Sequence, residues 1–251
     1  MTDTAPFAQL LDQIADRSTV LREAAAAAPD FTARVPGCPD WTLRDLVTHI
    51  GGVQRFWALA TTLADPSGPP GEERRGELAP QGDLLTWFGE STRLLIDALA
   101  AAGPDSPAWT WWGASDAPLT AGAIARHQVQ EAAVHAYDAQ ESAGKAEPLP
   151  AAIAVDGVAE FIQVGLGASG PWPHRPARIT FTATEGPAWV LELSPSGARL
   201  DPPTSGGPVA TVHGSASDLV LALYGRVPFD DLRVDGDRSV LAELIAWQPS
   251  E

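Results

Sequence analysis

Hydrophobic residues recur with helical spacing in four stretches of the first 142 residues. Apolar side chains at every third or fourth position predict helices from about Pro6 to Ala28, from Leu43 to Leu63, from Leu84 to Gly103 and from Thr120 to Ser142. Pro- and Gly-rich connections separate these stretches. Four helices of this length, joined by connections of intermediate length, are typical of a helical bundle.

The second of these helices carries two local signals. Thr42 is expected to cap its first turn, with Asp45 three residues further on. Gly51 and Gly52 lie in its middle, where each glycine costs about 1 kcal/mol relative to alanine. Glycines in such a position indicate close packing or a bound group.

The pattern changes after Gly144. A further helix is expected over Pro148–Leu166, and then Ala177–Thr184 and Trp189–Leu193 alternate with period two around a turn, which predicts a β-hairpin. The remaining expected elements are a strand at Val209–His213, a helix at Ala216–Tyr224, a strand near Leu232–Val234 and a final helix at Arg238–Trp247. We predict a helical bundle over residues 1–147 and a smaller α+β domain over residues 148–251.

Charge and composition exclude several classes of function. The formal net charge is −16 and the basic residues are scattered, so nucleic acid is not expected as a partner. No stretch approaches the roughly 20 apolar residues that cross a bilayer, and the first residues, with Asp3 instead of a basic cluster, do not resemble a secretory signal. We expect a cytoplasmic protein with no membrane partner, either a monomer or a weak homodimer.

Candidate metal ligands are few. The single cysteine, Cys38, excludes an internal disulfide and a thiolate cluster, so a metal would need nitrogen and oxygen ligands. Glu131 and His135 are four residues apart on the fourth predicted helix, and their side chains therefore share one face. His127 is on the same face, but eight residues of helical rise place it about 12 Å from His135. We therefore expect His127 to be a neighbour of the ligands or a surface residue.

A third ligand would have to come from another helix. His49 is the best candidate, with Asp45 in reserve. Two histidines and one carboxylate suit zinc and leave a coordination position open, as in catalytic sites. The alternatives are a solvated Glu131–His135 pair and an Asp45 that interacts with the helix dipole.

Four segments together resemble one protein family. They are Val35–Gly51, Arg126 with Gln130–Ala139, Tyr224–Pro228 and Leu232–Asp237. In this order they resemble the mycothiol-dependent maleylpyruvate isomerase family across nearly the whole chain. The resemblance implies a DinB-like up-down four-helix bundle followed by a smaller, sterol-carrier-like α+β domain.

The resemblance also implies roles for individual residues. His49, Glu131 and His135 match the metal ligands, and Asp138 matches a residue that orients a ligand or cofactor. Arg226 matches an arginine of the C-terminal domain that faces the site, with a catalytic and cofactor-binding role. The alternative for Arg226 is an ion pair with Asp230 or Asp231 in the adjacent loop.

The implied activity uses a thiol. Zinc-bound thiols are deprotonated at neutral pH and become nucleophiles. In the family the thiol is mycothiol, the low-molecular-weight thiol of actinobacteria, so we expect S-transfer to, or isomerisation of, a small electrophile. The alternatives are a carrier of apolar ligands with a structural metal and a thiol-independent metal hydrolase; nickel, iron or manganese could also occupy the ligands. For Cys38 we expect a structural role.

Overall fold

The chain forms two compact units. The structure is a computed structural model that describes residues 4–74, 79–201 and 207–248. The bundle consists of the described residues of Thr4–Trp111 and Pro118–Leu149, and the C-terminal unit consists of Trp112–Ala117 and the described residues from Pro150 onward. The division at Leu149–Pro150 is close to the expected boundary near residue 147, while the two domain ranges themselves stay predictions.

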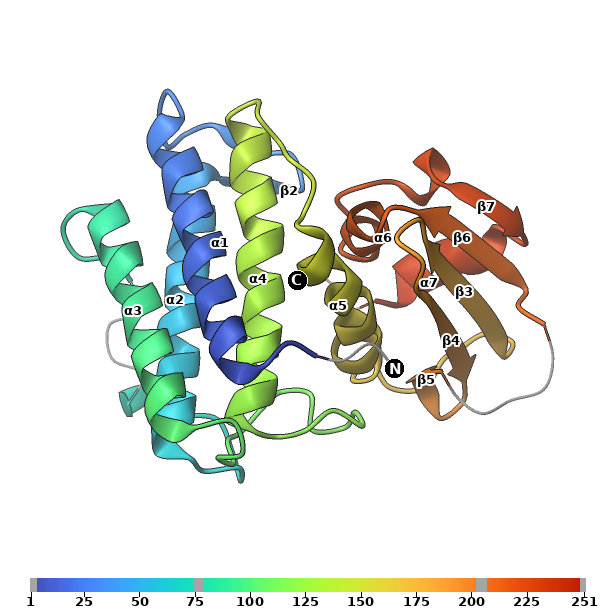
Figure 1. Ribbon diagram of the computed structural model, residues 1–251, viewed down its shortest axis with the longest axis horizontal. Helices are drawn as coiled ribbons and strands as arrows, with labels where there is room; N and C mark the ends of the chain where they lie inside the picture. The colour runs from blue at the N-terminus through green and yellow to red at the C-terminus, as the bar shows by residue number, and fades with distance from the viewer. Residues whose placement is uncertain (1–3, 75–78, 202–206, 249–251) are drawn as a thin grey trace. The chain divides into compact units, whose positions relative to one another are not determined.

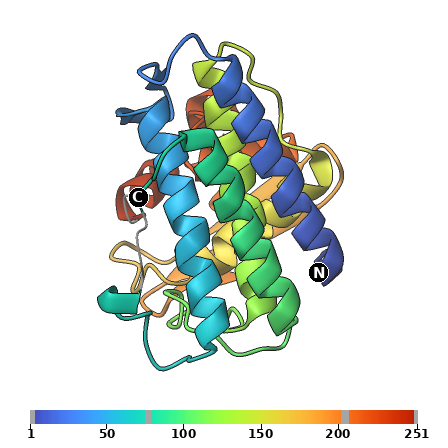
Figure 2. The ribbon, with the colours of Figure 1, turned by 90° about the vertical axis from the view of Figure 1, so that its left-hand side faces the viewer.

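The bundle contains the long helices that the periodicity predicted. They are α1 (Phe7–Ala27), α2 (Leu43–Leu63), α3 (Leu84–Ala102) and α4 (Ala121–Ser142), so each end lies within one residue of its predicted position. A short 3-10 helix, η1 (Glu72–Arg74), lies in the connection from α2 to α3. Figures 1 and 2 show the four long helices side by side.

The spatial order of the helices differs from their order along the chain. α1 packs mainly against α3 and α4, and α2 packs mainly against α3 and α4. Helices α1 and α2 therefore lie diagonally opposite each other. This arrangement makes α2 and α4, which carry the predicted metal ligands, direct neighbours.

Helices α2 and α3 run in the same direction. Gly51 of α2 lies against Trp87 of α3, and one turn further along both helices Nε of Arg55 donates to Oγ of Ser91 at 2.7 Å. The 20-residue connection over residues 64–83 allows this parallel pairing, because α2 is about 31 Å long at a rise of 1.5 Å per residue. A Cβ at Gly51 would overlap the indole ring of Trp87, so this glycine marks close packing, as the sequence indicated.

A small hairpin precedes α2 and was not predicted. Strand β1 (Arg34–Val35) pairs antiparallel with β2 (Cys38–Thr42). The last residue of β2, Thr42, is the N-cap of α2: its side chain accepts from the backbone N–H of Asp45, and the Asp45 carboxylate accepts from the backbone N–H of Thr42. This capping box confirms the predicted helix start and fixes the hairpin at the N-terminal end of α2.

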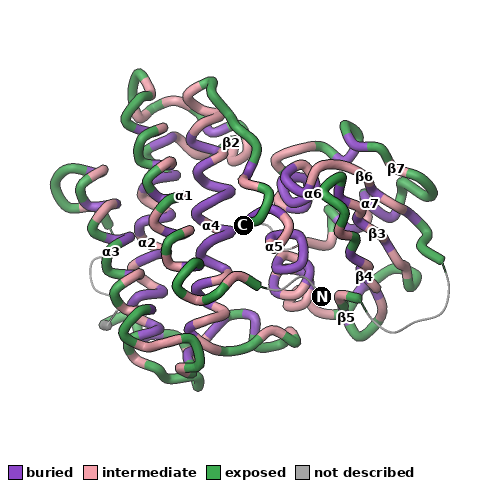
Figure 3. The backbone as a smooth tube through the Cα atoms, viewed as in Figure 1, coloured by how far each residue is buried: buried purple, intermediate pink, exposed green. Residues whose placement is uncertain are grey.

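The core of the bundle is mainly apolar and contains a polar network around Gln54. Fully buried side chains from α1, α2 and α3 include Leu21, Ile50 and Phe88, and Figure 3 shows buried segments in each of these helices. Within the core, Nε2 of Gln54 donates to Ser18 at 3.0 Å and Oε1 of Gln54 accepts from Thr92 at 2.8 Å. The amide of Gln54 is thereby satisfied and joins three helices.

The C-terminal unit is a mixed sheet with helices. Its strands are β3 (Ala177–Ala183), β4 (Ala188–Ser194), β5 (Gly197–Leu200), β6 (Ala210–Gly214) and β7 (Arg233–Gly236), in the described order β5-β4-β3-β6-β7. Only the β3–β6 pair is parallel among these described strands. Alternate residues of β3, β4 and β6 are buried, which gives the sheet one core face. Strand β5 was not predicted.

The helices of this unit are α5 (Ala151–Phe161), α6 (Ala216–Leu223) and α7 (Ser239–Trp247), with a short 3-10 helix, η3 (Phe229–Asp231). A π-helical turn, η2 (Ile162–Leu166), continues α5. The helix predicted over Pro148–Leu166 therefore begins three residues later than expected and ends where expected, and its last turn has π geometry. Helices α5 and α6 pack together, and α6 also contacts β3 and β6.

The bundle followed by an α+β unit confirms the fold class predicted from the sequence. The parallel α2–α3 pair departs from a strict up-down order, because the 20-residue connection is long enough to return to the end of the bundle at which α2 begins. Among the described residues, no helix combines the length and the apolar character that crossing a membrane requires.

Candidate metal centre

The three predicted metal ligands lie together in the bundle. Ligand atoms of His49, Glu131 and His135 are all within 4.8 Å of one another. His49 is in the second turn of α2, and Glu131 and His135 are one turn apart on α4. The donor set suits a single zinc ion, whose bonds to histidine nitrogen and carboxylate oxygen are about 2.0–2.2 Å long.

One of the three candidate ligands is buried and the other two are partly exposed. His135 is 2% exposed, whereas His49 and Glu131 have intermediate exposure. The side chain of Glu131 keeps 15% of its surface accessible. Solvent therefore reaches the cluster, as a site that exchanges small molecules requires.

Asp138 orients the imidazole of His135. Nδ1 of His135 lies 2.9 Å from Oδ2 of Asp138, and the Asp138 side chain is fully buried. A carboxylate accepts hydrogen bonds, so the proton of a neutral His135 lies on Nδ1. Its Nε2 atom then has a lone pair, and this atom is 3.8 Å from Oε2 of Glu131. Metal-bound histidines are commonly fixed in this way by a carboxylate.

An indole ring covers two of the imidazoles. The Trp41 ring centroid lies 4.6 Å from that of His49 and 6.2 Å from that of His135. Trp41 comes from β2, one residue before the N-cap of α2. Sequence reasoning placed Trp41 in a motif but gave it no role at the site; the signal was its position immediately before the cap, two helical turns from His49.

Two further predicted candidates have other partners. Asp45 is exposed and closes the capping box with Thr42, so it is not part of the cluster and its reserve role as a ligand is wrong. His127 does not belong to the cluster either; its Nε2 lies 3.5 Å from Oε1 of Glu131. The expectation that His127 and His135 do not share one ion agrees with this placement.

Comparison with known protein families identifies both parts of the chain. The family model described as the mycothiol maleylpyruvate isomerase N-terminal domain matches residues 11–140, which is more than half of the chain. The chain belongs to the mycothiol maleylpyruvate isomerase family. The model of the family's C-terminal domain matches residues 152–243 of this family member.

Solved structures support the same fold for this member of the mycothiol maleylpyruvate isomerase family. It is similar to a crystal structure of the mycothiol-dependent maleylpyruvate isomerase, with a TM-score of 0.62, 15% identity, and coverage of 92% of this chain and 93% of that one. A mutant of that isomerase has a TM-score of 0.63 at the same identity and coverage. No curated protein matches the chain significantly by sequence.

Arg226 lies in the C-terminal unit, three residues after the end of α6. Its Nη1 donates to the backbone carbonyl of Tyr224 at 2.7 Å, and the side chain is partly buried. The alternative partner Asp230 lies 3.0 Å from Nη1 of another arginine, Arg238. The catalytic role of Arg226 stays a prediction.

Cys38 lies in β2 and packs against the apolar core of the bundle. Its surroundings agree with the structural role expected from the sequence.

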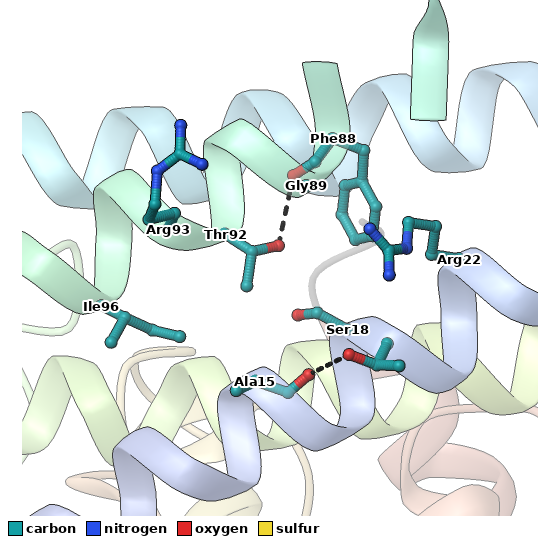
Figure 4. Close-up of a pocket in the computed structure, with 9 residues that line it drawn as sticks. Ala15, Ser18, Arg22, Phe88, Gly89, Thr92, Arg93 and Ile96 are labelled. Carbon is teal, nitrogen blue, oxygen red and sulfur yellow. Dashed lines mark hydrogen bonds between the residues drawn. The ribbon is translucent and has the colours of Figure 1, made fainter. Parts of the chain in front are cut away.

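A separate pocket of about 220 Å³ lies between α1 and α3. Figure 4 shows Ser18 and Thr92 in its centre, with Arg22 and Arg93 to either side. The two hydroxyl groups are hydrogen-bonded to Gln54 of α2. The pocket contains none of the three candidate metal ligands, and it is smaller than the roughly 300–1,000 Å³ that is usual for ligand sites.

Proposed function

We propose that this protein is a cytoplasmic zinc-dependent enzyme that activates mycothiol for S-transfer to, or thiol-assisted isomerisation of, a small electrophile. The observation that carries the proposal is the convergence of His49, Glu131 and His135 from two neighbouring helices. Family membership supports the choice of thiol and of reaction class.

Each residue of the site would have a distinct role in holding the metal. His49 and His135 supply neutral nitrogen donors, and Glu131 supplies a negative oxygen that offsets part of the ion's charge. Asp138 keeps the Nε2 lone pair of His135 available through its 2.9 Å contact with Nδ1. When bound, zinc would lower the pKa of a coordinated thiol so that the thiolate predominates at neutral pH.

Trp41 gives the site an apolar cover. Its ring shields His49 and His135 on one side, which lowers the local dielectric and strengthens charge interactions within the site. The partial exposure of His49 and Glu131 supports access from solvent.

Arg226 is proposed to bind an anionic group of the substrate or of the thiol. A guanidinium can form two parallel hydrogen bonds with a carboxylate, which fixes its orientation as well as its charge. Replacement of Arg226 by Lys keeps the charge but removes the pair of parallel hydrogen bonds. If Arg226 only binds the carboxylate, this variant is expected to raise KM more than it lowers kcat.

A thiol-dependent turnover assay tests the proposal. The purified protein is loaded with zinc and given maleylpyruvate or other activated alkenes and epoxides with mycothiol, glutathione or no thiol. We expect turnover with mycothiol that disappears after chelation and returns with zinc. Mass spectrometry of the product separates the two reactions, because the thiol leaves again in isomerisation and stays attached in S-transfer.

The two alternatives give different results in the same assay. A carrier of apolar ligands with a structural metal would give no rate above buffer with any thiol. A metal hydrolase that uses bound hydroxide would keep its rate without thiol. Either result would contradict the proposal.

A further inference from the structure

His127 contacts the middle residue of a ladder on α4. Its Nε2 lies 3.5 Å from Oε1 of Glu131, and Oε2 of the same carboxylate lies 3.8 Å from Nε2 of His135. The three side chains are successive i, i+4 neighbours on one helix face. Each carboxylate oxygen of Glu131 therefore faces a different imidazole.

The position of Glu131 between the two imidazoles leaves one of its oxygens outside the metal cluster. A carboxylate that binds an ion through one oxygen can rotate about its last bond unless a donor holds the other oxygen. Metal-binding carboxylates are usually hydrogen-bonded by a neighbouring group for this reason. His127, on the side of Glu131 opposite His135, is placed to be that donor.

Aromatic residues hold the ring of His127 in place. The His127 side chain is 8% exposed. Trp57 of α2 meets it edge to face at a centroid distance of 6.3 Å, and Trp111 does so at 5.6 Å. Trp57 itself stacks on Trp109 at 6.2 Å. An imidazole packed in this way has little freedom to turn its Nε2 away from Glu131.

We propose that His127 is a positioning residue that donates its Nε2–H to Oε1 of Glu131 and thereby holds Oε2 toward His49 and His135. The proposal rests on the proposed metal site and assigns His127 no contact with substrate. At 3.5 Å the contact is at the outer limit of a hydrogen bond.

Two variants separate the hydrogen bond from the packing. His127→Phe keeps a ring between Trp57 and Trp111 but has no donor. His127→Gln has an amide N–H near the position of Nε2 but no ring. Zinc affinity is measured by competition with a chromophoric chelator, the visible spectrum of the cobalt-loaded protein reports ligand geometry, and the melting temperature of the metal-free protein reports folding.

We expect His127→Phe to bind zinc about tenfold or more weakly, as other changes next to a metal ligand do. The same variant should alter the cobalt spectrum while it keeps the melting temperature of the metal-free protein. The Gln variant should recover most of the affinity even if its melting temperature falls. A matched control is His213→Phe, because Nε2 of His213 lies 3.0 Å from Oδ2 of Asp235 in the C-terminal unit and His213 is not part of the cluster. This control should leave zinc affinity unchanged.

Three results would overturn the inference. The Phe variant binding zinc as tightly as the wild type shows that the donor is unnecessary. A Gln variant that loses as much zinc affinity as the Phe variant shows that His127 acts through packing alone. Loss of a nitrogen ligand from the cobalt spectrum of both variants shows that His127 is itself a ligand. Failure of the wild type to bind zinc would instead overturn the proposed function, so the two failures are distinguishable.

Discussion

Replacing Asp138 by Asn removes one negative charge next to a candidate ligand and leaves the side-chain volume almost unchanged. Asp138 is fully buried and its Oδ2 lies 2.9 Å from Nδ1 of the equally buried His135. A neutral amide oxygen is a weaker acceptor for Nδ1–H than a carboxylate. If the amide instead turns its NH₂ toward Nδ1, the imidazole proton moves to Nε2, and the lone pair needed for a metal is lost.

The expected magnitude follows from the burial of this pair. Changes in groups that orient metal-bound histidines cost about 10- to 100-fold in metal affinity, which is about 1.4–2.7 kcal/mol. Because both partners are shielded from water, we expect Asp138→Asn to lie toward the upper end of this range.

Zinc affinity of the wild type and of Asp138→Asn is measured by chelator competition at neutral pH, with circular dichroism to confirm that the variant is folded. Asp235→Asn is the matched control, since Asp235 also accepts from a histidine, His213, at 3.0 Å but is exposed in the C-terminal unit. A folded Asp138→Asn protein whose zinc affinity equals that of the wild type would refute the reasoning.

Two further predictions concern the helices that present the site. Gly51→Ala should lower the free energy of unfolding by about 1–3 kcal/mol, because its Cβ would overlap the ring of Trp87. The control Gly89→Ala meets only the flexible end of an arginine and should be neutral or stabilising by up to about 1 kcal/mol. Urea unfolding of both variants tests this, and equal effects would contradict it. Thr42→Ala should cost about 1 kcal/mol at pH 7 through loss of the N-cap. The side-chain hydroxyl and backbone N–H of Thr42 hold the pKa of Asp45 below its usual value. The stabilisation that comes from these hydrogen bonds to the ionised Asp45 carboxylate is present above the unfolded pKa near 4. It disappears as pH falls through the lower folded pKa. The deficit of Thr42→Ala should therefore shrink in urea unfolding at pH 3, and a deficit independent of pH would contradict the assignment.

The helices could be predicted from the sequence because their signals are local. Apolar spacing, the Thr42 cap and the change of pattern after Gly144 depend on residues close together in the chain. The direction of α3 relative to α2 depends on how the 20-residue connection crosses the bundle, which no local pattern encodes. The hairpin of β1 and β2 was missed because its strands are short, and because Pro36 and Gly37 between them and Pro39 in β2 make the segment resemble a loop.

The candidate site could be predicted in part. Spacing alone placed Glu131 and His135 on one face, but the pairing of α2 with α4 that brings His49 to them is a property of the tertiary fold. The cover by Trp41 and the contact of His127 with Glu131 also depend on side-chain orientation in three dimensions. The role of Arg226 cannot be argued from spacing, because it lies almost a hundred residues after the ligands of α4.

The metal content of the purified protein and of His49→Ala tests the central claim most directly. His49 is the one candidate ligand that comes from α2, so its removal leaves only the two side chains on α4. Elemental analysis after gel filtration should find about one zinc per chain in the wild type and little in a folded His49→Ala protein. Full zinc occupancy in His49→Ala, or a wild type that binds no divalent metal, would contradict the account.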